Sequence, residues 1–484
     1  MRAIVVGIDG GGWNFLLDSA LADSGRVFRE VSSDSPSGDL ISTVPPVTGP
    51  AWVSFATGCN PGEHGCFGFL MPAGGLTETS PINSKNISRP TFYEILEKVG
   101  KKSILINLPC SYPPRIPGVV ITGLMTSGDR YIFPGGIEDE YRTLRKYRPF
   151  PDQGLMARRK TAEHLEDIRD VEERRFRCAR ELFESSWDFF FVLFSGLDWA
   201  LHSSSGGLRE ASENAGIRRI VGDIGRYLNW FVENCPPDAY LLLVSDHGFT
   251  DYNRTFYPNA LLRERGLLDL TERERGIEGP HRMYREYSSR SLNLGVPRPF
   301  VSLLRKSPRL MNLAFKTLEL SPVQVKSKTR LVLSGDTRAA CISPGMSRYG
   351  TVYLSENDGS LLGRVREELL AARDPSTGEE MVDRVWTRDE IYHGRSLGLG
   401  PHLVIRVREG CWVNNDLTFP RTTSTEREVN HGLLGIYALV ANGYAGNADF
   451  GRASIEDVAP TVLANYSLPL PGWLDGRPIF RLKG

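Results

Sequence analysis

The sequence predicts an α/β fold with a mostly parallel central sheet and helices on both of its faces. Short apolar runs alternate with helical segments along most of the 484 residues, a pattern typical of parallel sheets joined by helices. Three of these runs lead into an aspartate: 2–8, 187–198 and 239–248 lead into Asp9, Asp198 and Asp246. The carboxyl ends of parallel strands share one sheet edge, so we expect these aspartates to gather at a site there.

The composition is that of an ordinary globular protein, with 40% hydrophobic and 24% charged residues. Lys plus Arg equals Asp plus Glu at 58 each, which argues against a partner that is a nucleic acid polymer. Seven cysteines without a CxxC motif indicate neither a disulfide framework nor a thiolate zinc site. We find no secretory signal and no apolar run long enough to span a bilayer, so we expect a cytoplasmic protein.

The expected elements follow in order. The strand 2–8 ends in Asp9 and a Gly-Gly-Gly loop that lacks the GxGxxG spacing of dinucleotide sites. Helices are expected at 91–100 and 223–235. Further strands are expected at 102–109 and 117–127. The charged helical region 139–186 is expected to present a solvated face.

The pattern breaks down over 251–345, which we interpret as a helical or irregular cap inserted into the core. The core then comprises 1–250 and 346–484. Within 281–330 there are eleven Lys or Arg and only two acids, so the cap has a basic face. This face is equally consistent with a solvated surface, and peripheral contact with an anionic membrane is a weaker alternative.

The stretch 42–65, STVPPVTGPAWVSFATGCNPGEHG, is centred on Thr48. Pro45 and Pro46 prevent a helix before it, and Pro50 fits the first turn of a helix after it. Backbone N–H groups at such a step favour an anion. Taken alone, Thr48 is more often a simple helix cap.

Six further residues form a candidate metal-ligand set. Asp198 and His202 are spaced i, i+4 and face one side of a helical turn. Asp246 and His247 are adjacent after a strand, and His431 precedes another. Together they are Asp9, Asp198, His202, Asp246, His247 and His431. Nitrogen and oxygen ligands without cysteine suit zinc and tolerate manganese or iron.

A threonine hydroxyl is a weak nucleophile that needs a base or a metal to react. Two cations about 4 Å apart can activate it and neutralise a phosphoryl group. The residues above supply such a site. The remaining histidines, at 64, 164, 281, 393 and 402, are expected to be structural.

These motifs resemble those of the type I phosphodiesterase/nucleotide pyrophosphatase branch of the alkaline phosphatase superfamily. Within that branch the chain is most similar to a prokaryotic group of predicted phosphohydrolases and phosphomutases. The blocks that carry the resemblance run from Val5 to about Arg477: GIDGGG, the Thr48 stretch, GLDWALH, VSDHGF, NHGLLGIYAL and IEDVAPTVL.

The resemblance implies two zinc ions. Asp9, Thr48, Asp246 and His247 would hold one, and Asp198, His202 and His431 the other. Thr48 would attack phosphorus to form a phospho-threonine, which a metal-bound water would hydrolyse. A small phosphorylated substrate follows, and a phosphodiesterase is the expected activity.

The chain departs from the family pattern at Phe69, which stands where nucleotide pyrophosphatases have a phosphate-binding Asn. A nucleotide diester is therefore a less secure substrate. His402 stands where the family often has Asp, and we assign it no role. A phosphotransferase or phosphomutase on the same core is the main alternative, and a non-catalytic anion-binding protein is a further one. A sulfatase is disfavoured, because Glu63 replaces the arginine of the motif at Cys59.

Overall fold

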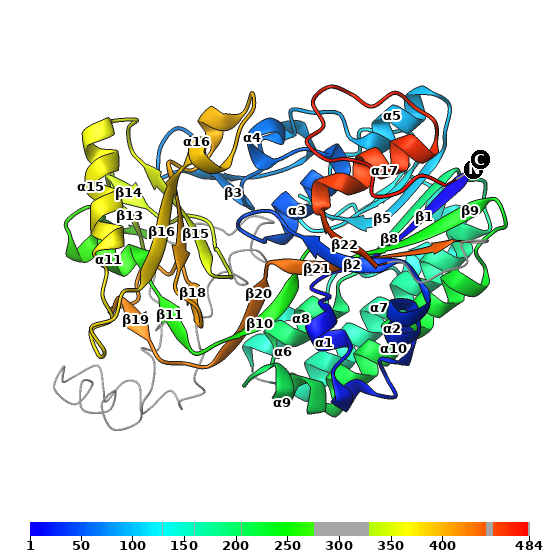
Figure 1. Ribbon diagram of the computed structural model, residues 1–484, viewed down its shortest axis with the longest axis horizontal. Helices are drawn as coiled ribbons and strands as arrows, with labels where there is room; N and C mark the ends of the chain where they lie inside the picture. The colour runs from blue at the N-terminus through cyan, green and yellow to red at the C-terminus, as the bar shows by residue number, and fades with distance from the viewer. Residues whose placement is uncertain (128, 159, 205, 275–328, 442–448, 483–484) are drawn as a thin grey trace.

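The computed structural model describes residues 1–127, 129–158, 160–204, 206–274, 329–441 and 449–482. A nine-stranded sheet organises the larger part of it (Figure 1). In spatial order its strands are β22 (Asp449–Ser454), β2 (Ser37–Ile41), β21 (Leu434–Ala441), β9 (Ala239–Val244), β1 (Arg2–Ile8), β8 (Phe189–Phe194), β5 (Ser103–Leu108), β6 (Val119–Thr122) and β7 (Ile132–Phe133).

The centre of this sheet is parallel. Strands β9, β1, β8, β5 and β6 pair in parallel with one another, and only β21 and β7 introduce antiparallel pairs next to them. Strands β1, β8 and β9 are almost entirely buried, as continuous apolar runs in a covered parallel sheet should be. The predicted mostly parallel sheet is confirmed.

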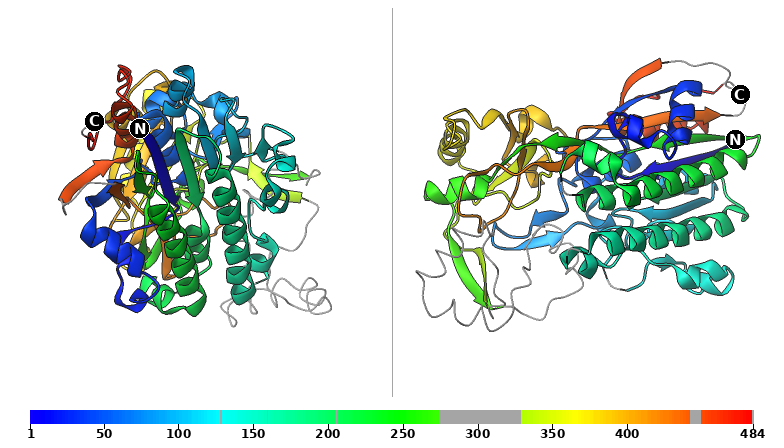
Figure 2. Two further views of the ribbon diagram at one scale, coloured as in Figure 1. Left: turned by 90° about the vertical axis from the view of Figure 1, so that its right-hand side faces the viewer. Right: turned by 90° about the horizontal axis from the view of Figure 1, so that it is seen from below.

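Helices cover both faces of this sheet, as Figures 1 and 2 show. One face is covered by α2 (Arg26–Asp34), α7 (Thr161–Phe183), α8 (Gly196–His202) and α10 (Ala215–Glu233). The other is covered by α3 (Thr48–Thr57), α5 (Phe92–Lys98) and α17 (Val458–Asn465). Two large apolar clusters fill the spaces on the two sides, as a layered α/β core requires.

A second, antiparallel sheet lies at the other end of the molecule (Figure 1). It contains β14 (Ala339–Ala340), β15 (Tyr349–Leu354), β17 (Leu403–Val407) and β16 (Val382–Thr387). Helices α11 (Pro258–Glu264) and α15 (Gly359–Leu370) share a separate apolar core with it. Strands β15, β16 and β17 therefore belong to this sheet, whereas β21 and β22 return to the large one.

Shorter elements connect these layers. Small ladders join β10 (Gly248–Tyr252) to β20 (Glu428–Gly432), β11 (Arg254–Phe256) to β18 (Cys411–Val413) and β19 (Thr423–Ser424), β12 (Leu270–Glu274) to β13 (Thr329–Leu333), and β3 (Leu70–Pro72) to β4 (Thr79–Pro81). Short helices include α1 (Trp13–Leu16), α4 (Pro61–His64), α6 (Gln153–Ala157), α9 (Leu208–Glu213) and α16 (Arg388–Ile391). The basic stretch 281–330 lies outside the described residues except for its last two positions. The division into a core and a 251–345 cap stays a prediction.

The solvated face predicted for 139–186 is wrong at two positions of α7. Glu172 is 1% exposed and Arg175 is fully buried, and the two form an ion pair. A buried carboxylate is unfavourable without a partner, and here each charge meets the other. Its neighbours are described below.

Candidate active site

Thr48 is the first residue of α3, and Val47 occupies the capping position without a side-chain hydrogen bond. The Thr48 hydroxyl therefore does not act as the helix cap that the alternative interpretation expected. Its oxygen lies 3.3 Å from Nε2 of His247 and 3.5 Å from Oδ1 of Asp9. The side chain is 5% exposed, so the hydroxyl is enclosed among potential ligands.

The first ligand cluster surrounds this hydroxyl. Asp9 follows β1, while Asp246 and His247 follow the neighbouring strand β9. Nε2 of His247 lies 3.4 Å from Oδ2 of Asp246 and 3.6 Å from Oδ1 of Asp9. One ligand atom from each of these residues lies within 4.8 Å of the others. The shared edge of the parallel sheet brings them together, as the strand pattern predicted.

The second ligand cluster joins helix α8 to strand β20. Asp198 and His202 are one turn apart on α8, with 3.3 Å between Oδ1 and Nε2. His431 reaches the same place from β20, with Nε2 3.4 Å from Asp198 Oδ1 and 2.9 Å from Nε2 of His202. All three side chains are buried. The i, i+4 spacing therefore does point both side chains of α8 to one place.

The two clusters adjoin each other. The rings of His247 and His431 stack, with their centroids 3.8 Å apart. Asp198, His247 and His431 also fall within 4.8 Å as a set of potential ligand atoms. All seven residues singled out in the sequence thus form one continuous buried group.

The tautomers of two histidines suit metal binding. Nδ1 of His431 lies 2.8 Å from the carbonyl oxygen of Pro46, and Nδ1 of His247 lies 3.2 Å from that of Gly248. A carbonyl accepts only, so each Nδ1 carries the proton and each Nε2 keeps its lone pair. Both Nε2 atoms face the clusters. Backbone carbonyls that fix ligand histidines in this way are typical of metal sites.

The electrostatics of the group also favour cations. Burial raises the pKa of Asp9 and of Asp246 well above the usual value, and nearby carboxylates raise both further. Burial also lowers the pKa of His247, as does the charge of His431. Oδ2 of Asp246 accepts no hydrogen bond from the described residues. Three converging carboxylates with imidazole nitrogens are the donor set of a divalent cation site.

Asp198 behaves differently from the other two aspartates. Burial opposes its ionisation, but the charge and hydrogen bond of His202, and then those of His431, hold its pKa well below the usual value. The Asp198 carboxylate therefore faces imidazoles, whereas Asp9 and Asp246 face further carboxylates. The two clusters differ in charge, one with two carboxylates and one with a single carboxylate.

A glycine lets the first loop approach this group. Gly10 has a φ of +75°, and a Cβ there would lie 2.5 Å from the Phe249 ring. That ring packs edge-on against His202 and His431. Any larger side chain at position 10 would displace a ring that supports the second cluster.

The other described histidines are held in different ways. Nδ1 of His64 accepts from the Cys66 N–H at 3.1 Å, so its Nε2 donates to Ser54 at 3.0 Å. This tautomer is the reverse of that of His247 and His431. Nδ1 of His402 accepts from the backbone N–H of Leu354. Both side chains have structural partners, as expected from the sequence.

Phe69 provides an apolar wall beside the turn that carries Thr48. It is 4% exposed, and a Cβ at Gly49 would lie 3.1 Å from its ring. It belongs to an apolar cluster with Val47 and Cys110. The position that carries an amide in nucleotide pyrophosphatases thus carries an aromatic ring next to Thr48.

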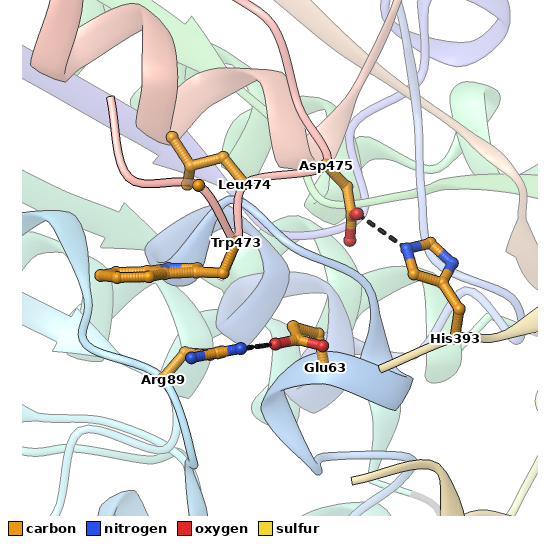
Figure 3. A pocket seen from close by; sticks show the side chains of 7 residues that line it. Glu63, Arg89, His393, Trp473, Leu474 and Asp475 are labelled. Carbon is orange, nitrogen blue, oxygen red and sulfur yellow. Dashed lines mark hydrogen bonds and ion pairs between the residues drawn. The ribbon is translucent and has the colours of Figure 1, made fainter. Parts of the chain in front are cut away.

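A separate pocket of about 420 Å³ is lined by residues of α4 and of the C-terminal tail (Figure 3). Its charged groups pair with one another: Arg89 with Glu63, and His393 with Asp475. The guanidinium of Arg89 also lies over the Trp473 ring, 5.2 Å from its centroid. These contacts fasten the tail to the core, and we assign the pocket no reaction.

Three residues near the site were not singled out in the sequence. Ser195 lies between β8 and α8, and its side chain hydrogen-bonds Asp9 and thereby lowers the pKa of that carboxyl. Asn107 donates to the Ser195 hydroxyl at 3.1 Å. Glu172 accepts from the Ser195 N–H at 3.0 Å. A signal for Glu172 was present, because it falls in the apolar stripe of its helix.

The comparison with known families agrees with this architecture. The sequence model of the family "Type I phosphodiesterase / nucleotide pyrophosphatase" matches residues 3–433. The protein is therefore an enzyme of the phosphoric ester hydrolase class, of the two-metal-ion type. It belongs to the type I phosphodiesterase/nucleotide pyrophosphatase family. No curated protein sequence matches the chain.

Solved structures support the fold. Murine ectonucleotide pyrophosphatase/phosphodiesterase 5 matches with a TM-score of 0.55 and 12% identity, over 97% of this chain and 96% of that one. Phosphonoacetate hydrolase from Sinorhizobium meliloti 1021, in complex with phosphonoformate, matches with a TM-score of 0.54 and 14% identity, over 95% and 94%. Both resemble this chain along nearly its whole length.

All seven cysteines are free thiols, in agreement with the absence of a disulfide pattern. Within the ranges that the structure describes, no helix has the length and apolar character needed to cross a membrane.

Proposed function

We propose that this protein is a phosphodiesterase in which Thr48 is the nucleophile. The observation that carries the proposal is the place of the Thr48 hydroxyl, at the start of α3 and within 3.5 Å of both His247 and Asp9. A hydroxyl enclosed by ligand atoms, in a family of phosphoric ester hydrolases, is suited to attack phosphorus.

The reaction proceeds in two displacements. The Thr48 oxygen forms a bond to phosphorus, the bond from phosphorus to the leaving ester oxygen breaks, and the hydroxyl proton ends on that oxygen, which departs as an alcohol. Asp9 Oδ1 is the nearest carboxylate oxygen to that proton. Water then adds to the phospho-threonine, which frees a phosphate monoester and restores the hydroxyl.

The seven residues divide between two cations. Asp9, Thr48, Asp246 and His247 would hold one, and Asp198, His202 and His431 the other. Two bound divalent cations supply charge neutralisation at the phosphoryl group and stabilise the alkoxide. Zinc is the expected ion because the donors are imidazoles and carboxylates, and manganese or iron would also be accepted.

An observation on a relative supports a small phosphorylated substrate, and one on this chain supports a diester over a monoester. An inactive form of the murine enzyme, in which a threonine is replaced by alanine, binds AMP, so that relative accommodates a phosphorylated nucleoside. In this chain, Phe69 offers an apolar surface beside Thr48 in place of a polar amide. An esterified phosphate oxygen of a diester fits such a surface better than the third charged oxygen of a monoester does.

The test compares hydrolysis of bis-p-nitrophenyl phosphate and p-nitrophenyl phosphate by the zinc-loaded protein. We expect the diester to react faster, and Thr48→Ala to lose roughly 10⁴-fold or more in kcat. Thr57→Ala is the matched control, since Thr57 lies on the same helix and donates only to the Val53 carbonyl.

Full activity in Thr48→Ala would overturn the nucleophile assignment. A faster reaction with the monoester would overturn the diester preference. Transfer of the phosphoryl group to an added alcohol, with little release to water, would instead identify a phosphotransferase or mutase. Zinc binding without turnover of either substrate would overturn the phosphodiesterase and point to a specialised phosphotransferase or an anion-binding protein.

A further inference from the structure

A buried ion pair lies beneath helix α8. Glu172 and Arg175, one turn apart on α7, are 2.5 Å apart and almost fully buried. Arg175 also donates to the carbonyl of Pro149 at 3.0 Å. A buried pair often contributes little net stability compared with apolar residues. The contacts of this pair with neighbouring elements therefore suggest a role other than stability.

The pair contacts α8 in two ways. Oε1 of Glu172 accepts from the backbone N–H of Ser195 at 3.0 Å, immediately before the first residue of the helix. The guanidinium of Arg175 lies 5.5 Å from the ring centroid of Trp199, in the middle of the helix. Both charges of the pair thus meet the element that carries Asp198 and His202.

The close approach of the two helices depends on Gly196. A Cβ at that position would lie 2.8 Å from Cγ of Glu172 and 3.2 Å from the Ile168 side chain. The absence of a side chain at Gly196 therefore lets α8 pack directly against the Glu172 side chain. A shift of α8 away from α7 would move both of its ligand side chains together, because they are fixed to one rigid turn.

Ser195 connects the Glu172 contact to the first ligand cluster. Its backbone is held by Glu172, and its hydroxyl receives a hydrogen bond from Asn107 and interacts with Asp9. Asn107 is anchored in turn to the Leu193 carbonyl at 3.0 Å. One residue thus joins the start of α8 to a ligand on β1.

We infer that Glu172, held by Arg175, is a positioning residue that fixes the two-cation site through the Ser195 N–H and the first turn of α8. This inference rests on the proposed function only in assuming that the clusters bind divalent cations. Outer partners that orient metal ligands commonly change metal affinity by about 10–100-fold.

The test separates the acceptor role of Glu172 from its charge. Two double variants remove the buried ion pair: Glu172→Gln with Arg175→Met keeps an oxygen that accepts from Ser195, and Glu172→Leu with Arg175→Met does not. Zinc affinity is measured by competition with a chromogenic chelator, without any substrate. Unfolding of each metal-free protein is followed in parallel.

We expect the Gln-containing variant to bind zinc within about threefold of the parent protein and the Leu-containing variant to bind at least about tenfold more weakly. Glu173→Gln is the matched control, because Glu173 faces Arg177, Arg226 and Tyr227 instead of α8. It should leave zinc affinity unchanged.

Equal zinc affinities in the two double variants would overturn the inference. If the Leu-containing variant does not fold, Gly196→Ala is the deciding variant, since its added methyl group would clash with Glu172 at the same contact. Unchanged zinc affinity in Gly196→Ala would also overturn the inference. Because zinc binding is read without turnover, the result is independent of whether Thr48 proves to be the nucleophile.

Discussion

The Nε2 atoms of His202 and His431 lie 2.9 Å apart, although 229 positions separate the two residues in the chain. One histidine comes from α8 and the other from a strand that follows the second sheet. The Pro46 carbonyl fixes the His431 proton on Nδ1, so its Nε2 presents a lone pair. A shared cation would give both nitrogens and the Asp198 carboxylate a common partner.

Removal of one of these imidazoles should therefore release a metal ion. We expect His431→Ala to reduce zinc affinity at the second cluster by more than about 100-fold, since loss of an outer partner alone can cost that much. Metal analysis after dialysis gives the stoichiometry. His393→Ala is the control, because that side chain is 70% exposed and pairs with Asp475 at the surface. Two retained zinc ions in His431→Ala would contradict the ligand assignment.

Removal of the metal should destabilise the protein as well as inactivate it. Without cations, Asp9 and Asp246 are buried near each other and near Asp198, and this burial with like charges raises their pKa. A ligand at 100 times its Kd stabilises the native state by about 2.7 kcal/mol. We expect chelation to lower Tm by several degrees and added zinc to restore it, as followed by differential scanning calorimetry. An unchanged Tm would argue that the clusters hold no metal.

His64 should make the fold sensitive to acid. Burial lowers the pKa of His64 to about 3, whereas the unfolded chain has a histidine pKa near 6.5. Between these values the unfolded state binds the extra proton, so stability is full above pH 6.5 and decreases as the pH falls. From pH 6.5 to pH 5 this histidine should cost about 2 kcal/mol of unfolding free energy.

Urea unfolding of the parent protein and His64→Gln at pH 7 and pH 5, both with chelator present, measures this contribution. The variant starts less stable because it loses the hydrogen bonds to Ser54 and Cys66. The difference between the two proteins should shrink by about 2 kcal/mol at pH 5. A pH-independent difference would show that His64 is not held neutral in the fold.

Two glycine substitutions should separate backbone strain from contact with the site. Gly10 and Gly100 both have positive φ, but a Cβ at Gly10 meets Phe249 at 2.5 Å and one at Gly100 meets nothing within 4 Å. Gly100→Ala should cost about 1 kcal/mol from strain alone. Gly10→Ala should cost more and should also weaken zinc binding, as measured by urea unfolding and metal titration. Equal losses would mean that Phe249 yields without moving the ligand rings.

Much of the fold followed from local patterns. Strands β1, β8 and β9 are continuous apolar runs, and the polar residues after them mark one edge of a parallel sheet. The spacing of apolar residues along the sequence does not reveal which sheet a strand joins, however. Strand β15 and its neighbours have ordinary strand patterns, yet they form an antiparallel sheet with its own core, because partner choice depends on long-range packing.

The residues around the site could be predicted from the sequence less well than the seven candidate site residues. Glu172 and Arg175 occupy the same helical stripe as Leu165, Ile168 and Ala179, which are buried, so helical spacing pointed to their burial. The charges themselves suggested solvent instead. Only the packing of α8 against α7 explains why a carboxylate belongs there, since it meets an N–H group of a separate segment.

By itself the sequence determined the class of fold, the family and the seven residues that meet at the sheet edge, because strand ends and motif spacing are local properties. Tertiary structure alone decided the tautomers of His247 and His431, the contact of Phe69 with the turn at Thr48 and the link from Glu172 to Ser195. Each depends on atoms that approach from distant segments, and hydrogen bonds and burial act over only a few ångströms of space.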